Sequence, residues 1–218
     1  MKTLAIVGAG PGMGLAIART FGRHGFQVAL IARNQGKLSD LVAQLDEEGI
    51  TAAGFSADVT ERSSLVAAFA VIKERFGAVD VLEFSPADWE LPFAAAPELS
   101  IANVQPQIDF YIHGAITAVE QVLPDMLARG SGTLLFTTGA SSLVPVPEFA
   151  NSGIAGAGLR NWVHTLHAAL AQQGIQAAHV AIGAWIGRQP GAEPEKIAPL
   201  YWELHTQRDL VERHFQLP

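Results

Sequence analysis

Four glycines at alternate positions follow the first apolar segment of the chain. Leu4–Val7 leads into Gly8-Ala9-Gly10-Pro11-Gly12-Met13-Gly14, and the helix-forming run Leu15–Ala18 comes next. A glycine turn between a strand and a helix lets the backbone approach a pyrophosphate, whose charge then faces the free N–H groups of the first helical turn. Glycine turns alone are common, but this one has the required context on both sides. The order predicts a dinucleotide site formed by Gly8, Gly10, Gly12, Met13 and Gly14.

The end of the second predicted strand indicates which dinucleotide is bound. A site for NAD(H) usually places Asp or Glu here, on the ribose 2′-hydroxyl. This chain instead reads Ile31-Ala32-Arg33-Asn34, and a guanidinium suits a 2′-phosphate. We therefore expect NADP(H) rather than NAD(H), with Arg33 and Asn34 in the site. The alternative is that Arg33 only caps a surface turn.

Short apolar runs alternate with longer amphipathic segments along the chain. The predicted strands are Leu4–Val7, Gln27–Ala32, Thr51–Phe55, Val79–Phe84, Gly132–Thr137 and Gln176–Ile182. The predicted helices are Gly12–His24, Gln35–Glu48, Ser63–Phe76, Ile101–Ala128 and Phe149–Gln173. Strands that alternate with helices form a parallel sheet through right-handed crossovers. We expect an α/β fold, a doubly wound parallel sheet (Rossmann fold) with helices on both faces, as one domain over residues 1–218.

The C-terminal part departs from this alternation. Pro194 and Glu195 can start a helix that runs to about Gln207, and Val211–Leu217 can form a short edge strand. We expect residues 190–210 to form a helical segment on the substrate side. Trp202 is expected to be a packing anchor, although the string Tyr201–His205 is also able to roof the substrate pocket.

Composition excludes several classes of function. The chain has no cysteine, which excludes a disulfide scaffold, a thiolate metal site and a cysteine nucleophile. Its net charge of −7 disfavours sequence-independent binding to the phosphates of nucleic acid. No targeting signal opens it, and no run approaches the roughly 20 apolar residues that span a bilayer. We expect a cytoplasmic protein with a small-molecule substrate and neither a nucleic-acid nor a membrane partner.

Over essentially its whole length the chain resembles the short-chain dehydrogenase/reductase family. The glycine spacing is that of the family, and further matches are Ala57-Asp58-Val59, Gly114 with Leu123-Pro124-Asp125-Met126, Gly132–Phe136 and Ala157-Gly158-Leu159-Arg160. The resemblance implies an oxidoreductase with a nicotinamide cofactor, in which Asp58 and Val59 contact the adenine. It also implies pairing of subunits through the long helices, so a homodimer or homotetramer is expected. Phe84 and Ser85, also expected at the cofactor, stand where the family has asparagines.

The resemblance breaks at the catalytic residues. The family uses an asparagine, a serine, a tyrosine and a lysine, and the corresponding positions here hold Tyr111, Gly139, Ser152 and Gly156. A shifted alignment does not restore the pair, because both tyrosines, Tyr111 and Tyr201, lack a lysine four residues later. We expect all four members of the tetrad to be absent.

Few side chains are available as substitutes. Tyr111 and Ser152 are the candidate catalytic residues, although a tyrosine packed against the fifth strand is the simpler explanation of Tyr111. Thr138, Ser141 and Ser142 lie where ligands bind in open sheets, and turn chemistry explains them equally well. His164 and His167 share a helix face, but further ligands for a metal cannot be placed, so we expect no metal site.

Three functions are compatible with these residues. The first is an NADP(H)-dependent oxidoreductase with an atypical active site. The second is a non-catalytic module that binds NADP(H) and reports the redox state to a partner. The third is a lyase or isomerase that reuses the pocket. We rank them in this order, because function depends on the site and not on the fold.

Overall fold

A parallel sheet forms the centre of the computed structural model, which describes residues 1–88 and 90–217. Within these residues seven strands pair in the order β3-β2-β1-β4-β5-β6-β7. They are β1 (Lys2–Val7), β2 (Phe26–Ala32), β3 (Ala52–Ser56), β4 (Val81–Phe84), β5 (Gly132–Gly139), β6 (Ile175–Gly183) and β7 (Glu212–Gln216). Each pair is parallel. The expected edge strand near the C-terminus is thereby confirmed.

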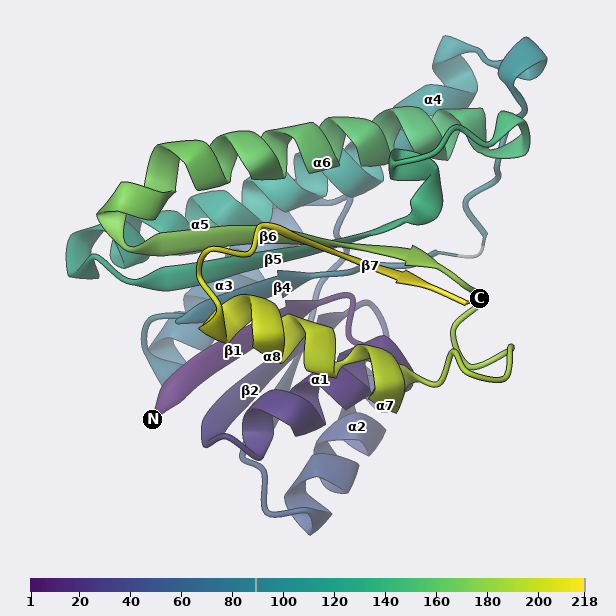
Figure 1. Cartoon of the computed structure of the whole chain (residues 1–218). Coiled ribbons are helices and arrows are strands. Elements are labelled where there is room, and N and C mark those ends of the chain that lie inside the picture. The colour runs from purple at the N-terminus through teal and green to yellow at the C-terminus, as the bar shows by residue number, and fades with distance from the viewer. Residues whose placement is uncertain (89, 218) are drawn as a thin grey trace.

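Helices cover both faces of this sheet (Figure 1). One layer contains α3 (Arg62–Phe76), α4 (Ile101–Ile108), α5 (Gly114–Arg129) and α6 (Ala150–Leu170). The other contains α1 (Met13–Gly22), α2 (Gln35–Glu47), α7 (Pro194–Ile197) and α8 (Pro199–Thr206). Short 3₁₀ turns lie at Ala96–Glu98, Ala140–Ser142, Pro147–Phe149 and Ala171–Gln173. The predicted single-domain, doubly wound α/β fold is confirmed.

The strand order determines where a ligand can bind. β1 pairs with β2 on one side and with β4 on the other. The chain adds β2 and β3 on one side of β1 and then returns to add β4 on the other side, so the strand order reverses at β1. In open parallel sheets the crevice at such a reversal, beyond the carboxyl ends of the strands, is the usual ligand site. The glycine turn follows β1 directly and therefore lies at this crevice.

Two predicted helices are interrupted. The segment predicted as one helix over Ile101–Ala128 is α4, one π-helical turn at Asp109–His113, and α5. The segment predicted from Pro194 divides into α7 and α8, because Pro199 has no N–H to continue the first helix. π-Helical turns inside α-helices often mark functional positions, and this one contains Tyr111.

The tail helix α8 packs against α1 and the sheet. Tyr201 and Leu204 on α8 are completely buried between α1 and the sheet, and Trp202 stacks on His24 with ring centroids 3.7 Å apart. Trp202 is therefore a packing anchor, as expected. Only the start of this region approaches the ligand edge, where Pro194 lies beside Gly12.

Candidate functional site

The turn after β1 is fixed in place by its neighbours. Gly8 has φ +97°, a conformation that only glycine adopts readily, and its N–H and that of Ala9 both donate to the Ile31 carbonyl, at 2.9 and 3.0 Å. A Cβ on Gly8 would lie 2.5 Å from the nitrogen of Pro86 and 2.8 Å from the carbonyl carbon of Ser85. The turn thus requires glycine here, because β1 and the end of β4 approach closely.

The first turn of α1 presents free backbone donors. Gly12 stands at the N-cap position and supplies no side-chain acceptor. Within the described chain, the N–H groups of Gly12, Met13 and Gly14 have no hydrogen-bond partner. These groups and the helix dipole favour an anion at this end. On Gly10 an added Cβ would meet nothing within 4 Å, so the turn has an open side.

Arg33, at the end of β2, lines a cleft of about 410 Å³. Its lining residues are Arg33, Asp58, Thr60, Glu61, Asp88, Leu91, Pro106, Asp109 and Phe110. Arg33 Nη1 is 2.9 Å from Asp88 Oδ2, so the guanidinium already has a carboxylate partner. A 2′-phosphate would have to take the place of that carboxylate.

The other residues expected at the adenine end have local structural roles. Asn34 caps α2 by accepting a hydrogen bond from the Lys37 N–H at 2.9 Å. Asp58 accepts from both the N–H and the hydroxyl of Thr60, at 2.9 and 2.7 Å. Val59 packs closely on Gly114 of α5. All three follow the carboxyl ends of β2 and β3, and one oxygen each of Asn34 and Asp58 is engaged in these local bonds.

Phe84 and Ser85 differ in what they can offer. The Phe84 ring is completely buried, 6.3 Å from the Phe136 ring, so only its backbone can face a ligand. Ser85 is half-buried at the end of β4, and its Oγ donates to Glu83 Oε2 at 2.8 Å.

Glu83 is a functional candidate that the sequence analysis missed. Its carboxyl is completely buried, accepts from Ser85 and from Thr137 Oγ1 (3.2 Å), and pairs with no cation in the described chain. Thr137 in turn lies 2.6 Å from the hydroxyl of Tyr201. Burial raises the pKa of Glu83 to about 8 despite these hydrogen bonds. The available signal was a carboxyl inside the otherwise apolar run Val81–Phe84.

The structure brings Tyr111 and Ser152 together. Tyr111 lies on the π-helical turn, Ser152 lies on the first turn of α6, and their side chains are hydrogen-bonded. Burial raises the pKa of the Tyr111 hydroxyl, and the bond to Ser152 offsets this only in part. The phenol is therefore suited to donate a hydrogen bond to a substrate oxygen and poorly suited to release its proton at neutral pH.

Gly139 and Gly156 lie on two elements that pack together, β5 and α6. Gly139 ends β5, and Gly156 lies one turn after Ser152 on α6. A Cβ on Gly156 would lie 3.3 Å from the Cβ of Ser142 and 3.7 Å from that of Thr138. Hydroxyl side chains therefore fill the space above β5 at this point of α6.

Of the two histidines expected to share a face of α6, His164 and His167, His164 contacts Glu212 at 3.2 Å. No metal-binding group of three or more His, Asp or Glu side chains exists within residues 1–88 and 90–217. In the same residues, no helix combines the length and apolar character needed to cross a bilayer.

A larger cleft, of about 530 Å³, lies between α1 and α8. Arg19 and Arg23 line it, but both pair with Glu48, at 2.6 and 3.3 Å. It is separate from the carboxyl ends of the strands. We therefore place the site at the glycine turn.

Comparison with known proteins gives a consistent result. Residues 2–186 match the family model described as short chain dehydrogenase. The chain is 29% identical over 182 residues to 2-(S)-hydroxypropyl-CoM dehydrogenase 3 of Xanthobacter autotrophicus, covering 84% of this chain and 71% of that protein.

Two solved structures extend the similarity to the whole fold. A short-chain dehydrogenase from Rhodopseudomonas palustris superposes with a TM-score of 0.85 at 25% identity, covering 100% of this chain and 99% of the other. The L-sorbose reductase of Gluconobacter frateurii, complexed with NADPH and L-sorbose, superposes with a TM-score of 0.88 at 21% identity, covering 99% and 94%.

Proposed function

This chain belongs to the short-chain dehydrogenase family, and from that premise we propose that it is an NADP(H)-dependent oxidoreductase with an atypical active site, acting on a small carbonyl or alcohol. The observation that carries the proposal is the turn after β1. There Gly8, held at φ +97° against Pro86, leads into an α1 whose first N–H groups are free for a pyrophosphate.

The residues present fit the cofactor. Free N–H groups on Gly12, Met13 and Gly14 suit the pyrophosphate, and Arg33 at the end of β2 suits a 2′-phosphate. Asp58, Val59 and the backbone of Phe84 and Ser85 lie along the same edge of the sheet. A bound nicotinamide supplies or accepts the hydride, and this chain must bind, orient and handle the proton.

The site is atypical because the tetrad positions hold other residues. Tyr111, Gly139, Ser152 and Gly156 replace the asparagine, serine, tyrosine and lysine, and the four lysines of the chain all lie outside α6. We infer that Tyr111 and Ser152 hold the substrate oxygen by hydrogen bonds, as their mutual contact and the raised pKa of Tyr111 support. We also propose that subunits pair through α5 and α6, where Ile116, Leu127 and Ile154 are exposed.

Turnover of a panel of carbonyls and alcohols, followed as NADPH consumption or formation, tests the proposed activity. We expect slow but measurable turnover, because hydride transfer depends on the cofactor whereas proton transfer contributes roughly 10²–10⁴-fold. Tyr111→Phe should lower the turnover rate by about 2- to 10-fold, which is the effect expected from the loss of one hydrogen bond. No turnover together with tight NADPH binding would favour the non-catalytic sensor, an alternative that Gly139 and Gly156 at catalytic positions support.

Selectivity for NADPH over NADH tests the role of Arg33. Arg33→Ala should weaken NADPH binding by about 1–3 kcal/mol, or roughly 5- to 150-fold in Kd, and leave NADH binding almost unchanged. Asp88→Asn is the matched variant, because it frees Arg33 from its ion pair and should tighten NADPH binding. Isothermal titration of the wild type and both variants with NADPH and with NADH measures the six dissociation constants. Equal wild-type affinities for NADPH and NADH would contradict the assignment.

A further inference from the structure

A continuous chain of polar side chains runs from the turn after β5 to the edge strand β7. Ser142 Oγ lies 2.7 Å from Thr138 Oγ1, which lies 2.8 Å from His179 Nε2. His179 Nδ1 lies 2.9 Å from Glu212 Oε1 on β7. Thr138, Ser142 and His179 are all buried. The four side chains thus form an unbroken path of hydrogen bonds over three adjacent strands and the turn that follows β5.

The protons of this path have a defined direction. Burial lowers the pKa of His179 to about 4, although Glu212 opposes the shift, so the imidazole is neutral at pH 7 and carries one N–H. The Glu212 carboxylate only accepts, which places that hydrogen on Nδ1. Nε2 must then accept from the Thr138 hydroxyl. With its hydrogen on Nε2, Thr138 can only accept from Ser142, whose own hydrogen otherwise bonds the Gly139 carbonyl. A proton leaving Ser142 therefore has a neutral imidazole at the end of its path, with the Glu212 carboxylate behind it.

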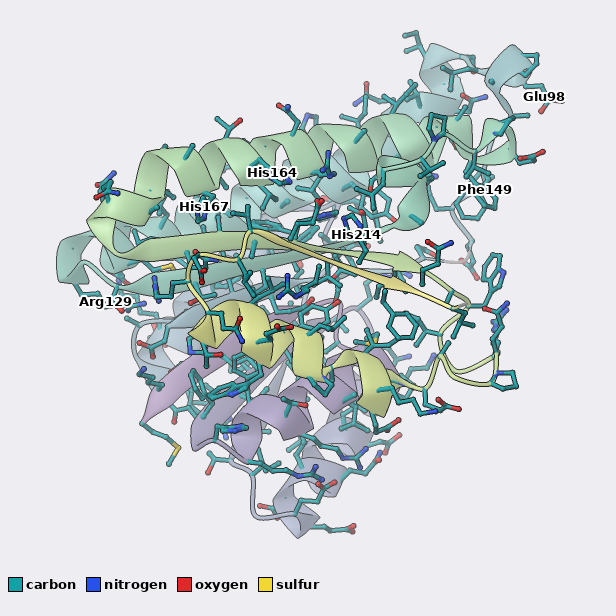
Figure 2. The ribbon with its side chains drawn as sticks, in the orientation of Figure 1. Glu98, Arg129, Phe149, His164, His167 and His214 are labelled. Carbon is teal, nitrogen blue, oxygen red and sulfur yellow. The ribbon has the colours of Figure 1, made fainter. Side chains whose placement is uncertain are left out.

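Glu212 is held in its ionised form by several donors. Burial alone would raise its pKa, but hydrogen bonds from Arg160, His214 and His164 hold the pKa well below its usual range. Arg160 binds both carboxylate oxygens, at 2.6 and 2.9 Å, while His214 and His164 lie at 2.7 and 3.2 Å. Figure 2 shows His164 on α6 and His214 on the strand at the sheet edge. Both histidines reach solvent, so this end can exchange protons with water.

The other end of the path lies at the candidate active site. Ser142 Oγ also lies 2.9 Å from the Gly139 carbonyl, and its Cβ is the closest neighbour of a Cβ built on Gly156. Gly139 and Gly156 hold the positions of the family's serine and lysine. The Ser142 and Thr138 hydroxyls therefore lie between these two positions, and Ser152 lies one helical turn from Gly156.

We propose that Ser142 exchanges the proton with the substrate oxygen, and that Thr138, His179 and Glu212 position and relay it in place of the tyrosine–lysine pair. This proposal rests on the proposed oxidoreductase function. In alcohol oxidation the substrate hydroxyl gives its proton to Ser142 Oγ, Ser142 gives its own to Thr138, and Thr138 gives its own to His179 Nε2. The resulting imidazolium faces Glu212. In carbonyl reduction the same protons move in the opposite direction, and the cofactor accounts for the hydride.

The absence of cysteine from the chain allows a direct test. In Ser142→Cys the single thiol occupies the end of the path, and its modification by methyl methanethiosulfonate is followed by mass spectrometry between pH 6 and 9. We expect the thiol to be modified in the folded protein. Adding His179→Gln or Glu212→Gln should lower the modification rate at pH 7 at least about tenfold, because the thiolate is the reactive form and the path then no longer accepts its proton. Ser141→Cys, one residue away and without a hydrogen bond to the path in the described chain, is the control and should not respond to either change.

Each result of this test has a defined meaning. Thermal melting identifies any variant that is not folded, and Glu212→Gln, which keeps the shape of the side chain, replaces His179→Gln if the latter unfolds. The proposal would be overturned if the Ser142→Cys thiol stayed unmodified while the Ser141→Cys thiol reacted. It would also be overturned if Ser142→Cys were modified at the same rate with and without His179→Gln or Glu212→Gln. The thiol measurement needs no cofactor. Failure of the oxidoreductase function therefore appears separately, as a loss of NADPH binding.

Discussion

Gly8→Ala should abolish measurable NADPH binding and lower the melting temperature by roughly 6–12 °C. The added Cβ would meet Pro86 and Ser85 at backbone atoms that cannot rotate away, and alanine at φ +97° is strained in addition. Together these effects should destabilise the fold by about 3 kcal/mol or more, which corresponds to that range for a domain of this size. Calorimetry with NADPH and thermal melting measure the two effects.

Gly10→Ala is the matched control for this substitution. A Cβ on Gly10 would meet nothing within 4 Å, so the variant should melt within about 2 °C of the wild type. Because Gly10 lines the open side of the turn, any loss of NADPH affinity without a change in melting temperature reports ligand contact alone. Wild-type affinity and stability in Gly8→Ala would show that the turn does not approach β4 as described.

Glu83→Gln should make the protein more stable above pH 8 and change its stability little near pH 5. A carboxyl whose pKa rises from 4.5 to about 8 on folding binds its proton more tightly in the folded state. Its burial is without electrostatic penalty below pH 4.5, and the penalty grows between pH 4.5 and 8 and is constant above pH 8. The full pKa shift corresponds to a loss of roughly 4–5 kcal/mol in the free energy of unfolding. The glutamine amide does not ionise, so the variant does not have this loss.

Urea unfolding of the wild type and of Glu83→Gln between pH 5 and 9 measures this difference. Glu74→Gln, which changes an exposed glutamate on α3, is the control and should show no such trend. If the difference in free energy of unfolding between wild type and Glu83→Gln stayed constant over this range, the raised pKa of Glu83 would be refuted.

The fold could be predicted from the sequence because its signals are local. The turn at Gly8–Gly14 follows its strand and precedes its helix within a few residues, and the alternation of apolar runs defines the strands. The interruptions were harder to predict. The π-helical turn at Asp109–His113 leaves the apolar pattern almost unchanged, and Pro199 can end one helix or begin another.

The polar networks could not be predicted, because their members are distant in sequence. His179 and Glu212 are 33 residues apart, and Thr137 and Tyr201 are 64 apart. Only the paired strands and the packing of α8 bring them together. The sequence predicts an Arg33 side chain that is available to bind a phosphate, whereas in the structure Arg33 forms an ion pair with Asp88. Polar residues inside apolar strands, such as Glu83 and His179, were the one available sign.

Titration of the wild-type protein with NADPH tests the central claim most directly. The free N–H groups at the start of α1 and the glycine turn before it predict saturable binding of NADPH at micromolar concentrations, with weaker binding of NADH. A folded protein that shows no heat and no fluorescence change with either nucleotide at millimolar concentration would contradict the account.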